Sequence, residues 1–342
     1  MPRFGFLHDD SILFVTAQSL AQSGEYRIAS LPEQPYETKY PPLYPKYLSL
    51  AWKWEPNFPA SLRLLIWMNW IFLPVWLALS FNLYRRHGFS QPMSWILIGV
   101  MALNPTLVLF SVSALTEVLF TCGLLVLFRA MEKDGARIAF AAGLIAGLLC
   151  LCRTAGAALL LSAPIYYAWK GSRRNAVLFL VGILPFLVGW TAWAHLHRIT
   201  TADPELTFYT DYLGFQFLNV GWHNILPVIS TNFRELLAGI GSLAIPRLSE
   251  SLFLKVATAL AAVAMVGGVW RLAKRGQFRH YALFGSVSVA ILLVWHFPPN
   301  ERFVLPLYPL LLAGLFSELD RFWQLLSTAR RSKERETLLD RK

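Results

Sequence analysis

Two adjacent carboxylates and a lysine in the first forty residues are the strongest candidates for chemistry in this sequence. Asp9 and Asp10 lie within "HDDSILFVTAQSLAQSGEY", and Lys39 precedes the cluster "YPPLYP". An aspartate can take a proton from a hydroxyl or an amine as a general base. A nearby lysine can stabilise the negative charge of a departing phosphate. Helix capping is the alternative for the aspartates, because aspartate is favoured at helix N-termini, and Asp10 before "SILF" suits that role.

Composition places these residues in a membrane protein. The chain has 342 residues, of which 56% are hydrophobic and only 15% are charged, whereas soluble domains average about 25% charged residues. The net charge of +11 does not indicate nucleic-acid binding, because the basic residues lie between hydrophobic runs rather than on one soluble face. We therefore expect membrane lipids, and no nucleic acid, among the partners.

Hydrophobic runs predict an all-α, polytopic fold with about nine transmembrane helices. A bilayer needs roughly 20 apolar residues per helix, with about 17–25 tolerated. Two further amphipathic stretches, 10–24 and 43–54, are too short and too polar to span and suit helices lying in the membrane interface. The predicted spans are 62–83, 92–111, 114–131, 137–152, 154–169, 175–195, 251–270, 281–297 and 303–320.

Short basic connections predict the orientation of these spans. The stretches "NLYRRHG", "WKGSRRN" and "RLAKRGQFRH" fall on one side, which the positive-inside rule assigns to the cytoplasm. Residues 1–61 and 196–250 then form outward segments, separated by six spans over 62–195. Three further spans occupy 251–320, and a basic, disordered cytoplasmic tail covers 321–342. An outward N-terminus without a signal peptide also leads us to expect another span upstream of Met1. The alternative is that residues 1–61 cross the membrane together with the first hairpin.

The order of these features resembles a known family. The aspartate pair, an interfacial helix ending at Gly24, and Lys39 followed by "YPPL" are similar to the first outward loop of the GT-C glycosyltransferases. This group includes the protein O-mannosyltransferases and the aminoarabinose transferases that modify lipid A. The stretches "NPTLVLFSVSALTEVLF", "AGLLCLCRTAGAALLL" and "ERFVLPLYPLLLAG" also resemble the family. The stretch 196–250 matches nothing that we can name.

The resemblance implies roles for particular residues. Asp9 would activate the acceptor, and Asp10 would support it, bind a metal or cap its helix. Lys39 would contact the donor phosphate.

Charged residues at the predicted helix ends are further candidates. Arg153 and Arg302 would also bind the phosphate, because guanidinium groups match phosphate oxygens, although snorkelling to the interface is the alternative for both. Glu117 either faces the cavity or caps its helix, and Tyr44 is a supporting residue. No cofactor is required by these motifs, although His8-x-Asp10 leaves a divalent metal open.

We therefore expect an inverting glycosyltransferase at the outer face of the cytoplasmic membrane. It would move a sugar from a polyprenyl-phosphate donor to a lipid, polysaccharide or protein acceptor. A transporter or flippase is the first alternative, and ionisable residues deep within the spans would favour it. An inactive truncated homologue is the second alternative.

Overall fold

The chain folds almost entirely into helices. The computed structural model describes residues 4–5, 7–199, 201, 203–211, 214–215, 221–246 and 251–339, with the backbone alone over 329–339. Within these ranges turns and short loops join the helices, and the β-pairing consists of one isolated antiparallel bridge between Arg27 and Tyr36. The predicted all-α class is confirmed.

Two short helices form the core of the N-terminal segment. Helix α1 (Asp9–Gln22) and helix α2 (Leu43–Trp54) begin and end within two residues of the predicted interfacial helices. They pack on each other through Phe14 and Trp52, whose rings lie 4.6 Å apart and whose indole Nε1 donates to the Phe14 carbonyl at 3.1 Å. The chain between them, which carries Lys39, is therefore held against a packed helix pair.

Four helical stretches in the described part of the chain are long and apolar enough to cross a membrane. The first joins α3 (Ala60–Trp70) to α4 (Phe72–Arg86), and the second is α10 (Arg173–His197). The others are α14 (Leu252–Lys274) and the region 301–328. The last comprises α16 (Glu301–Val304), the 3₁₀ turn η3 (Leu305–Leu307) and the start of α17 (Tyr308–Leu339). The chain is thus a helical membrane protein, and the count of nine spans stays a prediction.

The predicted span 92–111 is broken. Helices α5 (Gln91–Ala102) and α6 (Pro105–Ser111) meet at an angle of 64°. Asn104 explains the break, because its side chain caps α6 by accepting from the Leu107 amide, and Pro105 begins the new helix. The remaining predicted spans coincide with α7 (Glu117–Met131), α8 (Ala136–Cys152), η1 (Thr154–Ala158) with α9 (Leu159–Trp169), and α15 (Arg279–Leu293).

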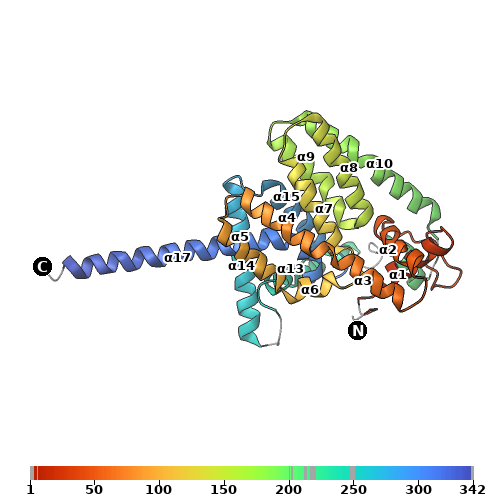
Figure 1. The fold of residues 1–342 in the computed structure, drawn as a ribbon, viewed down its shortest axis with the longest axis horizontal. Coiled ribbons are helices and arrows are strands. Elements are labelled where there is room, and N and C mark those ends of the chain that lie inside the picture. Colours follow the sequence, from red (N-terminus) through yellow and green to blue (C-terminus); the bar gives the residue numbers. More distant parts are fainter. Residues whose placement is uncertain are drawn as a thin grey trace.

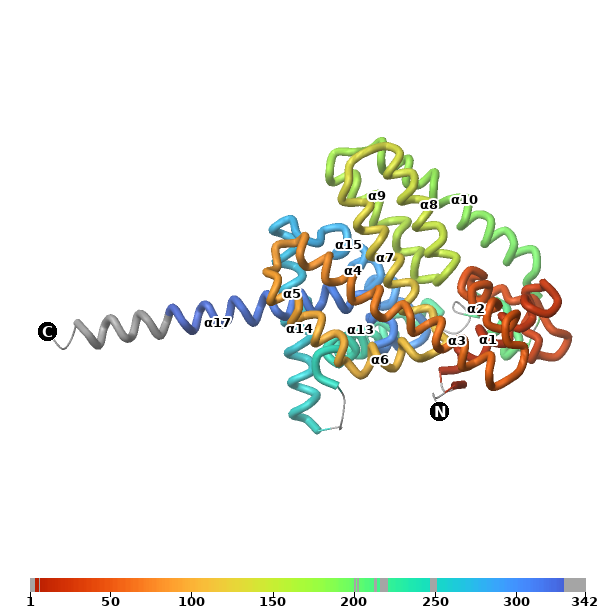
Figure 2. Tube along the Cα trace, in the orientation of Figure 1, coloured from red at the N-terminus to blue at the C-terminus, as the bar shows by residue number. Residues whose placement is uncertain are grey.

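Glycines let the long helices approach closely. A Cβ at Gly182 of α10 would lie 2.6 Å from the Phe140 carbonyl of α8, and one at Gly143 of α8 would lie 2.3 Å from the Phe179 carbonyl of α10. Figures 1 and 2 show these two helices side by side, with α9 to the left of α8. Small residues serve the same purpose at many membrane helix interfaces.

The stretch 196–250 contains more structure than the predicted outward loop. It forms α11 (Pro204–Thr210), η2 (Trp222–Asn224) and the 18-residue α13 (Ile225–Ser242). Buried Asn232 fixes α13 against the end of α15 by donating to the carbonyls of Leu292, Leu293 and Trp295 at 3.0, 3.1 and 2.6 Å. Helix α13 was not predicted because polar residues interrupt its sequence, and the prediction relied on continuous apolar runs.

The first part of the predicted tail 321–342 is helical rather than irregular. Helix α17 continues without interruption from Tyr308 to Leu339, and Figure 1 shows it projecting away from the other helices. No proline or glycine lies between 315 and 339, so nothing in the sequence stops the helix there.

Candidate active site

A large cavity separates the N-terminal segment from the membrane helices. Its volume is about 1020 Å³, and four of the predicted site residues line it: Asp9, Lys39, Arg153 and Arg302. The remainder of the wall is largely apolar and includes Leu184, Leu187 and Val188 of α10 and Ile291 and Leu292 of α15. The cavity therefore combines a charged region with an apolar body.

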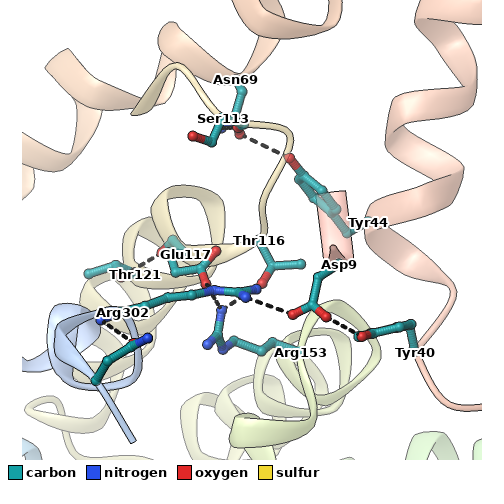
Figure 3. A network of polar contacts seen from close by, with 11 residues as sticks. Asp9, Tyr40, Tyr44, Asn69, Ser113, Thr116, Glu117, Thr121, Arg153 and Arg302 are labelled. Atoms are coloured by element: carbon teal, nitrogen blue, oxygen red, sulfur yellow. Dashed lines mark hydrogen bonds and ion pairs between the residues drawn. The ribbon is translucent and has the colours of Figure 1, made fainter. Parts of the chain in front are cut away.

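Asp9 is held from two sides at the start of α1. Its Oδ1 accepts a hydrogen bond from the Tyr40 hydroxyl, and its Oδ2 pairs with Arg302 Nη1 at 2.7 Å (Figure 3). The side chain stays partly accessible, with 26% of its surface exposed. A carboxylate offers about four lone-pair sites, so these two donors orient Asp9 and leave capacity for a substrate hydroxyl.

Glu117 lies at the centre of a charged cluster that also contains Asp9, Arg153 and Arg302. It is fully buried in the first turn of α7, where its Oε1 pairs with Arg302 Nε and, at 2.6 Å, with Arg153 Nη1. Arg153 Nη1 also donates to the Thr116 hydroxyl at 2.8 Å, as Figure 3 shows. Asp9, Glu117, Arg153 and Arg302 have no net charge together. Removing Glu117 would take the carboxylate partner from Arg153 and leave Arg302 paired with Asp9 alone, which is costly in a buried setting.

Glu117 takes neither of the positions that the sequence left open. Its Oε1 contacts two arginines rather than a backbone amide, and Glu117 is not among the residues that line the cavity. Arg153 and Arg302 likewise do not snorkel, because both side chains turn inward onto Glu117 and are 11% exposed. A guanidinium carries five N–H groups, and the contacts described here engage one nitrogen of Arg153 and two of Arg302.

Lys39 lies beside this cluster in a largely apolar setting. It is 5% exposed, and its Nζ lies 3.5 Å from the centre of the Phe208 ring. Burial lowers the pKa of Lys39 to about 8, although the carboxylates of Asp9 and Glu37 favour the charged form. Lys39 lines the cavity together with Asp9.

Buried Glu37 shapes the turn that presents Lys39. Its Oε1 accepts hydrogen bonds from the backbone amides of Lys39 and Tyr40 at 2.7 and 2.9 Å. Burial raises the pKa of Glu37 to about 7, against the effect of those two amides. Sequence reasoning missed both Glu37 and Tyr40, although they flank Lys39 in "ETKY".

Asp10 and Tyr44 lie apart from the cavity. Asp10 is 2% exposed, and its carboxylate accepts from the amides of Gly5 at 3.0 Å and Ser11 at 2.9 Å. It is not the N-cap of α1, which is His8. Buried Tyr44 directs its hydroxyl to Asn69 Oδ1 at 3.4 Å, away from Asp9. Both residues support the segment that carries Asp9 and Lys39.

Residues from the stretch 196–250 cover the N-terminal segment. The Thr38 hydroxyl donates to the Thr210 carbonyl, and Phe208 lies under Lys39. His8 Nε2 lies 2.8 Å from the Tyr209 hydroxyl, so the structure directs His8 to the tyrosine while Asp10 bonds to backbone amides. His8 and Asp10 therefore do not converge as a metal site. In the sequence, only the aromatic content of this stretch indicated that it could contact the site.

Comparison with known proteins supports the architecture. No protein-family model matches the chain, and no curated protein matches it. A solved structure, ArnT from Cupriavidus metallidurans bound to undecaprenyl phosphate, is similar over 92% of this chain with a TM-score of 0.54. The helical architecture of this chain is therefore similar to that of ArnT. Sequence identity to ArnT is 14%, and this chain covers 56% of ArnT, just over half of its length. The likeness thus concerns the fold.

Proposed function

We propose that the chain transfers a sugar from a polyprenyl-phosphate donor to an acceptor at the outer face of the membrane. The observation that carries the proposal is the cavity, which places Asp9, Lys39, Arg153 and Arg302 beside an apolar body of about 1020 Å³ in total. An amphiphile suits such a cavity, because its anionic head would lie at the charged residues and its hydrocarbon tail along the apolar wall. The fold is shared with ArnT, whose structure holds undecaprenyl phosphate, and this supports the same class of lipid.

Each charged residue has a role in the proposed step. Asp9 accepts the proton of the acceptor hydroxyl or amine, whose oxygen or nitrogen attacks the anomeric carbon from the face opposite the phosphate. The bond between that carbon and the phosphate oxygen breaks, and the electron pair leaves with the lipid phosphate. Lys39, Arg153 and Arg302 stabilise this charge as it develops. Attack from the opposite face inverts the anomeric configuration.

Glu117 and Tyr40 act through the residues that contact substrate. Glu117 fixes both guanidinium groups by charge-assisted contacts. The Tyr40 hydroxyl and Arg302 together set the direction of the Asp9 carboxylate. We assign both as positioning residues, along with Asp10, whose backbone contacts hold the first turn of α1.

Sugar transfer in membranes containing the full chain tests the proposal. Radiolabelled sugars on polyprenyl phosphate are supplied to wild type, Asp9→Asn and a control, Asp134→Asn, whose carboxylate pairs with Lys170 away from the cavity. General-base catalysis contributes roughly 10²–10⁴-fold, so we expect Asp9→Asn to lose at least about a hundredfold in rate. Full activity of Asp9→Asn at equal protein level would refute the assignment. Absence of transfer by wild type with every donor would refute the activity.

A further inference from the structure

A second cluster of ionisable residues lies at the other end of α7. Glu132 follows the last residue of this helix, whose 15 residues span roughly 22 Å at about 1.5 Å per residue. His87 follows the last residue of α4, and His280 lies in the first turn of α15. Three helices thus bring one side chain each to a common point, remote from Asp9.

The two imidazoles converge on one carboxylate oxygen. His87 Nε2 lies 3.3 Å and His280 Nε2 lies 3.7 Å from Glu132 Oε1, and all three ligand atoms lie within 4.8 Å of one another. His280 is 3% exposed. Both Nε2 atoms are buried, and the contacts that they make with Glu132 Oε1 do not have the geometry of hydrogen bonds. Buried polar atoms are normally satisfied, so two such nitrogens at one point need an explanation.

We propose that His87, Glu132 and His280 bind a zinc ion. Zinc bonds to imidazole nitrogen and carboxylate oxygen are about 2.0–2.2 Å long, which places tetrahedral ligand atoms about 3.3–3.6 Å apart. The distance from Glu132 Oε1 to His87 Nε2, 3.3 Å, falls within this spacing, and the distance to His280 Nε2, 3.7 Å, lies just outside it. Nitrogen donors favour zinc over calcium or magnesium, which prefer oxygen ligands. Three protein ligands leave the fourth position to water.

Two arginines complete the surroundings of the proposed site. Arg86 Nε and Arg129 Nη1 each lie 3.1 Å from Glu132 Oε2, and Arg86 Nη2 donates to Oε1 at 3.2 Å. They hold the carboxylate with Oε1 toward the imidazoles, as outer contacts of metal ligands commonly do. Their positive charge also repels the ion, so binding is weaker than at an otherwise equal site without them. The bound ion would join the ends of α4, α7 and α15.

Cobalt binding to the purified full chain tests the proposal. Cobalt(II) replaces zinc in tetrahedral sites and gives visible ligand-field absorption. The chain is stripped with a chelator and titrated, and we expect one Co²⁺ per chain, displaced by Zn²⁺. His87→Ala and His280→Ala should each weaken binding at least tenfold. His223→Ala, which removes an exposed histidine of η2, should not change it.

Two outcomes would overturn the proposal. One is the absence of saturable binding by wild type, which would leave a proton shared between Glu132 and an imidazole as the explanation. The other is equal binding by His280→Ala and His223→Ala. If the alanine variants fail to fold, X-ray absorption of the zinc-loaded wild type decides, because the proposal requires scattering from two imidazoles. These readouts need no substrate, so they are independent of the proposed sugar transfer.

Discussion

At the residue scale, the properties of the candidate site come from neighbours rather than from single side chains. Lys39 sits on an aromatic ring and beside two carboxylates, and burial lowers its pKa to about 8. A lysine with a pKa of about 8 loses its charge just above neutral pH. Lys39 must be protonated to bind phosphate. Its titration therefore sets an alkaline limit on the proposed reaction.

We expect sugar transfer to decline as pH rises through about 8. Below this value Lys39 carries its proton and binds phosphate, and above it the charge is lost. Lys39→Arg keeps a positive charge at all accessible pH values, so its decline should move to higher pH even if its maximal rate is lower. Rates measured between pH 6 and 10 check this, and superimposable alkaline limbs for the two proteins would contradict it.

Glu37 makes the stability of the fold depend on pH in the acidic to neutral range, below the pH at which Lys39 loses its charge. Burial raises its pKa from 4.5 to about 7, so the folded state binds more protons than the unfolded state between these values. Stability should therefore fall as pH rises from about 4.5 to about 7. Glu37→Gln keeps an oxygen for the Lys39 and Tyr40 amides and removes the ionisation. The difference in Tm between pH 5 and pH 8 should shrink in this variant. Glu33→Gln, an exposed change in the same connection, should leave the difference unchanged.

At the element scale, close helix contacts hold the wall of the cavity. Gly182 lies where α10 meets α8, whereas Gly189, two turns further along the same helix, has no atom within 4 Å of an added Cβ. Gly182→Val should destabilise the protein by about 1–3 kcal/mol because it overpacks this contact. Gly189→Val should have little effect. Thermal unfolding in detergent measures both, and equal Tm values for the two variants would show that the contact is not tight.

Local sequence patterns predict an element correctly when the residues that determine its bounds lie within or beside the element itself. The apolar spacing of α1 and α2 placed both helices within two residues, because each has its own periodic face and a turn-rich boundary. Helix α13 was not predicted, since the carbonyls that accept from its buried Asn232 lie at the end of α15, sixty or more residues away. The bend at Asn104 also depends on a side-chain cap that apolar composition does not show.

The same distinction applies to the candidate site. Asp9, Lys39, Arg153 and Arg302 were expected from residue type, position and the family resemblance, and all four line one cavity. The position of Glu117 at the centre of the charged cluster could not be predicted, because its partner Arg302 is 185 residues distant in sequence. The covering contacts of Phe208 and Tyr209 likewise depend on tertiary packing.

At the scale of the whole molecule, the basic connections gather at one end. Gln277 Nε2 donates to the His87 carbonyl at 2.6 Å, Lys170 pairs with Asp134 at 2.7 Å, and Glu132 lies beside His280. Asp9 and Glu117 lie at the other end of α7. This separation supports the predicted orientation, in which the basic end faces the cytoplasm and residues 1–61 face outward.

Cysteine labelling in intact cells tests this orientation. Gln34 and Arg275 are both exposed and lie in the N-terminal segment and in a basic connection, respectively. A membrane-impermeant thiol reagent should label Gln34→Cys in intact cells and Arg275→Cys only after permeabilisation. The three native cysteines are buried and should give little background. The reverse pattern would place the cavity on the cytoplasmic side and contradict transfer at the outer face.

Binding of a lipid phosphate to the purified chain tests the central claim most directly, since it requires no knowledge of the sugar or the acceptor. Polyprenyl phosphate and the uncharged polyprenol are compared on wild type, Lys39→Ala and Lys46→Ala, the last an exposed lysine of α2 that does not line the cavity. Hydrogen bonds to charged groups contribute about 1.5–3 kcal/mol, so we expect Lys39→Ala to weaken phosphate binding at least tenfold. Lys46→Ala should match wild type, and polyprenol should bind more weakly than polyprenyl phosphate. Equal binding of the two lipids, or equal affinities of the two lysine variants, would contradict a phosphate site at the charged region of the cavity.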